Sequence, residues 1–138
     1  MKVYIASSLR NKKTDFICKK LKENNIEYYN PAVIDLDERI NAERIEIFNK
    51  CLHEIEYNCN ILLAIAPYGR SVSGEVAYAG CLKSHGMRKI IILYNSSSES
   101  PCIEEMEAIQ APFFDVVFND LQDLIRYIIK LDCSRKMN

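Results

Sequence analysis

The sequence of 138 residues has no long apolar run, little glycine and proline, and no excess of charge of either sign. A membrane span needs about 18 consecutive apolar residues, and no segment approaches that length. The first six residues lead straight into serine, without the apolar region of a secretion signal. Only four glycines and four prolines exclude collagen-like and linker-dominated chains. We therefore expect a cytoplasmic protein that does not bind membranes.

Charge and composition narrow the classes of protein further. Lysine and arginine number 18 against 19 aspartates and glutamates, so the formal charge is −1. A nucleic-acid binder needs a basic excess, which this balance excludes. Hydrophobic residues make up 49% of the chain, which excludes intrinsic disorder. The length fits one domain over residues 1–138, since domains usually have about 100–200 residues.

Several cofactor motifs are also missing. None of the six cysteines forms a CxxC pair, and with only two histidines there is no zinc-ligand spacing, so we expect reduced thiols and no metal. Neither GxGxxG nor GxSxG occurs. Gly69 and Gly74 have the spacing of a phosphate-binding loop, but Glu75-Val76 follows where lysine and serine or threonine are required. We therefore expect no cofactor and no ATP chemistry.

The sequence alternates short apolar runs with longer amphipathic stretches. The runs predict strands at 3–6, 26–30, 61–66, 89–94 and 116–118. The stretches predict helices at 14–23, 37–57, 73–85, 102–109 and 121–131, with a frayed tail at 134–138. This alternation predicts an α/β fold: a single-domain three-layer sandwich with a flavodoxin- or Rossmann-like five-stranded parallel sheet covered by helices on both faces.

Ligands of such folds bind beyond the carboxyl ends of the strands. The most informative loop there is followed by Gly74-Glu75-Val76-Ala77-Tyr78-Ala79-Gly80. We expect Ser73 to begin the helix, which places Glu75 in the first turn, where the helix dipole favours an ionised carboxylate. That position suits a nucleophile, although first-turn glutamates are also common as simple dipole partners.

The segments Tyr4 to Arg10, Glu75-Val76-Ala77-Tyr78-Ala79 and Gly86-Met87-Arg88-Lys89-Ile90 carry a family resemblance. Together they resemble the nucleoside 2-deoxyribosyltransferase family, including its relatives that hydrolyse 2′-deoxynucleoside 5′-monophosphates. The resemblance implies that Glu75 is the nucleophile and that Tyr4 holds its carboxylate by a hydrogen bond. It also implies a role in purine and pyrimidine salvage and a homodimer or larger homo-oligomer.

The chain departs from the family where the resemblance expects an acid/base aspartate, because Cys51 stands there. A thiol with an ordinary pKa of about 8.5 replaces a carboxylate poorly. Around it, the resemblance and the loop positions suggest substrate-binding residues. We expect Tyr29 in the sheet or at its rim, with Tyr29 or Pro31 at the wall of the base site. The full set is Ser7, Ser8, Arg10, Pro31, Gly69, Ser71 and Ser73.

Substrate and outcome stay open between alternatives. Arg10 and the Ser71–Ser73 turn fit a 5′-phosphate, but a solvated arginine and a plain helix cap fit equally well. A nucleoside or a monophosphate, and transfer or hydrolysis, all agree with the residues. A non-catalytic deoxynucleotide-binding module that lost the aspartate is the second hypothesis. A receiver-like signalling domain ranks last, because Ala6-Ser7-Ser8 has no acid at the end of the first strand.

Overall fold

The computed structural model describes residues 1–8, 11–31, 41–96 and 110–137 of the chain. At its centre lies a five-stranded parallel sheet in the order β2-β1-β3-β4-β5. The strands are β1 (Lys2–Ala6), β2 (Glu27–Tyr29), β3 (Ile61–Ile65), β4 (Ile90–Tyr94) and β5 (Val116–Phe118). This is the flavodoxin-like order, in which the winding direction reverses between β1 and β3.

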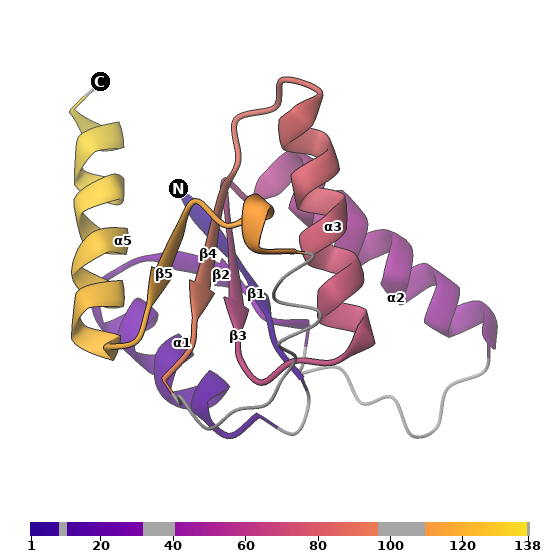
Figure 1. Ribbon diagram of the computed structural model, residues 1–138, viewed down its shortest axis with the longest axis horizontal. Coiled ribbons are helices and arrows are strands. Elements are labelled where there is room, and N and C mark those ends of the chain that lie inside the picture. Colours follow the sequence, from indigo (N-terminus) through magenta and orange to yellow (C-terminus); the bar gives the residue numbers. More distant parts are fainter. Residues whose placement is uncertain (9–10, 32–40, 97–109, 138) are drawn as a thin grey trace.

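Helices cover both faces of the sheet, as Figure 1 shows. On one face, α1 (Lys13–Glu23) and α5 (Leu121–Lys136) pack over an aliphatic core. On the other face lie α2 (Asn41–His53) and α3 (Arg70–Ser84). A π-helical turn, η2 (Glu54–Asn58), continues α2, and a short 3₁₀ helix, η3 (Ala111–Phe113), precedes β5. The predicted three-layer sandwich is confirmed.

All five predicted strands form. The three central strands β1, β3 and β4 are buried between the two helical layers, whereas the edge strands β2 and β5 are partly exposed. β3 is the central strand, and all five of its residues are buried, which explains its uninterrupted apolar sequence. Its partners are β1, with Tyr4 opposite Leu62, and β4, with Ile65 opposite Tyr94. Buried parallel strands need apolar residues on both faces, so the sequence pattern and the topology agree.

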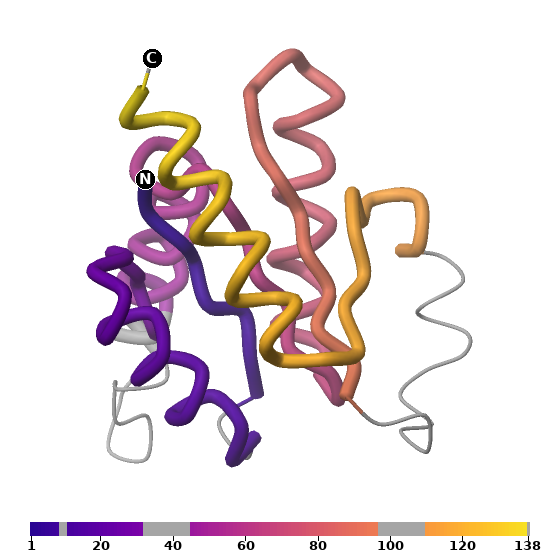
Figure 2. Tube along the Cα trace, turned by 90° about the vertical axis from the view of Figure 1, so that its left-hand side faces the viewer, coloured from indigo at the N-terminus to yellow at the C-terminus, as the bar shows by residue number. Residues whose placement is uncertain are grey.

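Two helix boundaries differ clearly from the prediction. α3 begins at Arg70, three residues before the predicted start at Ser73, with Gly69 as its cap. α5 continues to Lys136, so the tail from Ser134 is helical, and Asp132 in its last turns is buried. The amino terminus lies 3.7 Å from Asp132, which brings the two ends of the chain together (Figure 2). The predicted helix at 102–109 lies outside the described residues.

The long predicted helix at 37–57 has an irregular end. Its described part runs as α2 to His53 and then widens into η2, where the Cys59 N–H donates to the Glu54 carbonyl at 2.8 Å. Lys89 stabilises this turn, because its ammonium donates to the carbonyls of Glu56 and Cys59, each at 2.7 Å. Such π turns are rare and often occur at functional sites.

Candidate functional site

Tyr4 and Glu75 meet on the face of the sheet covered by α2 and α3. Tyr4 is the third residue of β1 and is fully buried, while Glu75 lies on α3. Burial raises the pKa of Glu75, and the Tyr4 hydroxyl partly opposes that rise because it stabilises the ionised carboxylate. The two groups nevertheless make no hydrogen bond of ordinary geometry. In the described part of the chain, the Tyr4 hydroxyl and Glu75 Oε2 are both buried without a hydrogen-bond partner. Buried polar atoms of this kind call for an explanation in a native structure.

The electrostatic reasoning about Glu75 from the sequence was wrong. Because α3 begins at Arg70, its first turn contains no acidic residue, and Glu75 lies one turn deeper. The helix dipole acts mainly within the first turn, so it gives this carboxylate little support. Burial dominates instead and raises the pKa of Glu75 to about 7, against the smaller effect of Tyr4. Near neutral pH the carboxyl is therefore a mixture of its protonated and ionised forms.

Cys51 joins Tyr4 and Glu75 from α2. The residue is 8% exposed, and the pKa of its thiol is raised, chiefly by burial and also by the charge of Glu75. The hydroxyls of Tyr4 and Tyr29 lie close enough to oppose that rise. A buried thiol with a raised pKa stays protonated, so Cys51 is neither a strong acid nor a ready nucleophile.

Tyr29 completes this group, although the sequence predicted it only as a rim residue or as an alternative to Pro31 at the wall of the base site. It is the last residue of β2 and pairs in register with Tyr4 across the strands. The two rings stack with centroids 5.7 Å apart and planes 25° from parallel. The Tyr29 hydroxyl is a further buried atom without a hydrogen-bond partner within the described ranges. Together Tyr4, Tyr29, Cys51 and Glu75 form what we call the tyrosine–glutamate cluster.

The other predicted site residues that the structure describes lie around the carboxyl ends of the strands. Ser7 Oγ accepts a hydrogen bond from Thr14 Oγ1 at 2.8 Å, and the Ser8 carbonyl accepts from the Asn11 N–H at 2.9 Å. Pro31 follows β2 and is partly buried. Gly69 and Ser71 are exposed at the start of α3. Arg10 lies outside the described residues.

Ser73 is part of a polar network that the sequence did not reveal. Gln110, which is 5% exposed, donates from Nε2 to Ser73 Oγ at 2.6 Å and to the Ser73 carbonyl at 2.8 Å. Its Oε1 accepts from the Tyr68 hydroxyl at 2.7 Å. The Ser73 side chain thus fastens residue 110 to the start of α3, and its hydroxyl is not the helix cap that was predicted. Nothing local marks Gln110, since its partners are 37 and 42 residues away.

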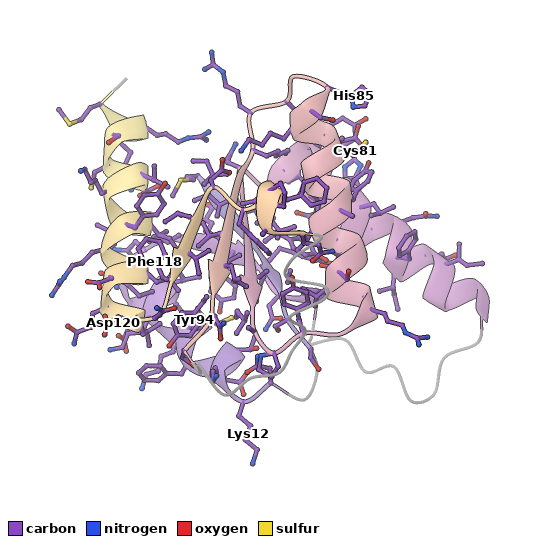
Figure 3. The ribbon with its side chains drawn as sticks, viewed as in Figure 1. Lys12, Cys81, His85, Tyr94, Phe118 and Asp120 are labelled. Atoms are coloured by element: carbon purple, nitrogen blue, oxygen red, sulfur yellow. The ribbon has the colours of Figure 1, made fainter. Side chains whose placement is uncertain are left out.

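Two residues of the α3 segment make polar contacts outside the tyrosine–glutamate cluster. Tyr78, part of the motif behind the family resemblance, donates from its hydroxyl to Glu56 on η2 at 2.6 Å. His85 follows the last turn of α3, where its Nδ1 lies 2.8 Å from the Cys81 carbonyl. Figure 3 shows Cys81 and His85 at one end of the molecule and Lys12 and Tyr94 toward the other, where the parallel strands end. At this place His85 is a partner of the carboxyl end of α3.

The described residues form neither a group of metal ligands nor a helix that could span a membrane. They contain no group of three or more histidine, cysteine, aspartate or glutamate side chains placed to hold a metal ion. The described cysteines are unpaired, with Cys18, Cys51 and Cys59 buried and Cys81 and Cys133 exposed. None of the described helices has the length and apolar character needed to cross a membrane.

Comparison with known proteins defines the class of fold. No family model and no curated protein matches this sequence. Among solved structures, a 2-deoxyribosyltransferase from the psychrotolerant bacterium Bacillus psychrosaccharolyticus has a TM-score of 0.69, covering 91% of this chain and 90% of its own at 18% identity. A conserved protein from Enterococcus faecalis V583 has a TM-score of 0.70, covering 96% and 98% at 11% identity.

At these identities the likeness shows a shared fold. The chain is an α/β protein with a flavodoxin-like parallel sheet, and it shares this fold over nearly its whole length with a 2-deoxyribosyltransferase. The fold expected from the family resemblance is therefore confirmed.

Proposed function

We propose that this protein cleaves the N-glycosidic bond of 2′-deoxynucleosides or their 5′-monophosphates, with Glu75 as the nucleophile. The observation that carries the proposal is the pairing of Tyr4 and Glu75, in which the Tyr4 hydroxyl and Glu75 Oε2 are buried and lack hydrogen-bond partners among the described residues. The pairing lies on a sheet whose strand order is flavodoxin-like, the class that binds ligands beyond its strand ends. The solved 2-deoxyribosyltransferase of the same fold supports the choice of reaction.

The chemistry needs an ionised carboxylate below the sugar. As the bond between C1′ and the base nitrogen breaks, its electron pair leaves with the base, and the sugar gains oxocarbenium character. A Glu75 oxygen then forms a bond to C1′, giving a covalent deoxyribosyl-enzyme. A second base or a water molecule attacks C1′ in the next step and releases Glu75. Deoxyribose lacks the 2-hydroxyl group, so its oxocarbenium ion forms more readily than that of ribose.

The experiment that tests this function is a screen for base release. The purified protein is incubated with the four 2′-deoxynucleosides, their 5′-monophosphates and the matching ribonucleotides, and free base is measured by chromatography. We expect release from the deoxy compounds and a mass increase on Glu75 by peptide mass spectrometry. Equal turnover of ribose and deoxyribose compounds, or an adduct on another residue, would contradict the proposal.

Arg10 distinguishes the two substrate classes. If Ser8, Arg10 and the Ser71–Ser73 turn bind a 5′-phosphate, Arg10→Ala removes a charge-assisted contact that contributes about 1.5–3 kcal/mol. The monophosphate then binds about 10–100-fold more weakly, while the nucleoside binds as before. Lys12→Ala, which removes an exposed charge two residues away, is the control. Equal weakening for both ligands would show that Arg10 does not bind a phosphate and would favour the transferase reaction.

One observation favours a second function, a non-catalytic deoxynucleotide-binding module. The raised pKa of the Cys51 thiol leaves the cluster without a strong acid beside Glu75. The variant Cys51→Asp separates the two functions, because general acid catalysis contributes about 10²–10⁴-fold to a rate. A wild-type protein that binds deoxynucleotide without releasing base, together with an active Cys51→Asp variant, would establish the binding module.

A further inference from the structure

The Tyr29 hydroxyl is buried, but it makes no hydrogen bond to the described residues that would stabilise the fold. Within the described residues it has no hydrogen-bond partner, and the same is true of the Tyr4 hydroxyl and Glu75 Oε2 beside it. A buried hydroxyl that binds nothing lowers stability, and phenylalanine would fill the same space without that cost. Three such oxygens in one cluster indicate that a ligand with several polar atoms binds against them.

The Tyr29 ring is held in a defined position, so its hydroxyl has a defined direction. It stacks on Tyr4, which pairs with it across the strands. The ammonium groups of Lys2 and Lys50 lie 5.7 and 5.9 Å from the ring centroid. The hydroxyl itself lies beside the Cys51 thiol, close enough for each to alter the protonation of the other. A group fixed in this way can select a ligand atom.

The cluster offers few donors to a departing base. An N-glycosidic bond breaks faster when the base nitrogen or a ring atom conjugated with it receives a hydrogen bond or a proton. The Tyr4 hydroxyl interacts with the Glu75 carboxylate, and the Cys51 thiol is a weak donor. The Tyr29 hydroxyl is the remaining strong donor in the cluster.

We propose that Tyr29 donates a hydrogen bond to the base as it leaves, and so acts as a catalytic residue of the reaction assigned above. This inference rests on the proposed function. The electron pair of the C1′–N bond moves onto the base, the Tyr29 O–H stabilises the growing negative charge there, and Glu75 takes up C1′. Burial raises the pKa of Tyr29 to about 12, so the phenol keeps its proton, and the released base takes its proton from water.

The test compares Tyr29→Phe with Tyr28→Phe on substrates that differ in their need for this hydrogen bond. Tyr28 is the matched control, because it is the neighbouring residue on β2 and packs against the core on the opposite face. The substrates are 2′-deoxyguanosine 5′-monophosphate and its N7-methylated form. The methylated base already carries a positive charge, so it leaves without help from a donor. The measured quantities are kcat, KM and the thermal unfolding midpoint.

We expect Tyr29→Phe to lower kcat on the unmethylated substrate by about 10–100-fold and on the methylated one by less than about 3-fold. Its unfolding midpoint should equal or exceed that of the wild type, and Tyr28→Phe should keep the wild-type kcat on both substrates. Equal losses on both substrates, or an unchanged kcat in Tyr29→Phe, would overturn the role of Tyr29 while base release by the wild type upheld the proposed function. A wild type that releases base from neither of these nor any other deoxynucleotide would overturn both.

Discussion

The two faces of the sheet are built from different kinds of residue. Under α1 and α5 the buried residues are almost all branched aliphatics, among them Ile5, Leu63 and Ile128. Under α2 and α3 the core contains alanines at positions 6, 64, 66 and 79, together with the cysteines and tyrosines of the site region. This second face also contains three buried oxygens that lack hydrogen-bond partners in the described ranges, and they belong to Tyr4, Tyr29 and Glu75.

The two faces should contribute differently to the stability of the fold and to the proposed reaction. Aliphatic side chains on the α1/α5 face exclude water and contribute about 1.5–3 kcal/mol each when fully buried. On the α2/α3 face, smaller side chains and unsatisfied polar atoms lower stability, which is a common property of functional sites. The proposed function therefore assigns ligand binding to the α2/α3 face, while the α1/α5 face contributes mainly to stability. Substitutions on the two faces should have opposite effects on activity and on unfolding.

The largest expected effect is that of Glu75→Gln on base release. Loss of the nucleophile should lower the rate by more than about 10³-fold, since such substitutions in other enzymes cost up to about 10⁶-fold. The fold should remain, because a neutral amide replaces a carboxyl whose Oε2 is buried with no partner among the described residues. Base release by chromatography and the unfolding midpoint check both points.

Glu46→Gln is the matched control for this experiment. Glu46 lies on α2 and is exposed, so its substitution removes the same charge without touching the cluster. Comparable rates in Glu75→Gln and Glu46→Gln would end the assignment of chemistry to the α2/α3 face.

On the opposite face we expect a large loss of stability without a loss of chemistry. Leu124 on α5 is fully buried, and Leu124→Ala should lower the free energy of unfolding by about 2–5 kcal/mol, because it leaves a cavity. Denaturant unfolding measures this value, and kcat below the unfolding transition should stay within about 2-fold of wild type. Gln122→Ala, on the exposed side of α5, should change stability by less than about 0.5 kcal/mol. A catalytic defect in folded Leu124→Ala would show that the two faces are coupled.

Local sequence patterns were enough to predict the sheet and the layers. The apolar runs of β1, β3 and β4 match the central strands because burial on both faces demands uninterrupted apolar residues, as in β3. The edge strands β2 and β5 are shorter and partly exposed. The sequence placed the start of α3 too late, because serine is a common capping residue at the start of a helix. In the structure Gly69 is the cap, and the Ser73 side chain is hydrogen-bonded to Gln110. That partner lies 37 residues further along the chain, beyond the reach of local reasoning.

The candidate site was predicted less evenly than the fold. The family resemblance drew attention to Tyr4, Cys51 and Glu75, which the structure brings together on one face. Tyr29 was named only as a rim residue, because its place in the cluster depends on strand register, which pairs it with Tyr4. The pKa of Glu75 was misjudged because burial is a tertiary property and the helix dipole is a local one.

The buried carboxyl of Glu75 should also make stability depend on pH. Its pKa is about 7 in the folded protein and about 4.5 when exposed, so the folded state binds more protons between these values. Stability from this group is therefore complete below about pH 4.5 and is lost as the pH rises through 7, by up to about 2–3 kcal/mol. The measurement is the free energy of unfolding of wild type minus that of Glu75→Gln, from pH 4.5 to 8. A difference that stays constant over this range would show that Glu75 is well solvated.

The smallest effect concerns the interaction between Tyr4 and Glu75. Glu75 can act as a nucleophile only when it is ionised. The rate of base release should therefore rise as the pH passes through about 7, the pKa of Glu75. The Tyr4 hydroxyl lowers that pKa, so Tyr4→Phe should move the midpoint of the pH–rate profile upward by about 0.5–1 pH unit. The variant then loses more activity at pH 6 than at pH 9. Tyr127→Phe, on the α1/α5 face, should leave the midpoint where it is. A parallel loss at every pH in Tyr4→Phe would mean that Tyr4 positions the substrate without tuning the carboxylate.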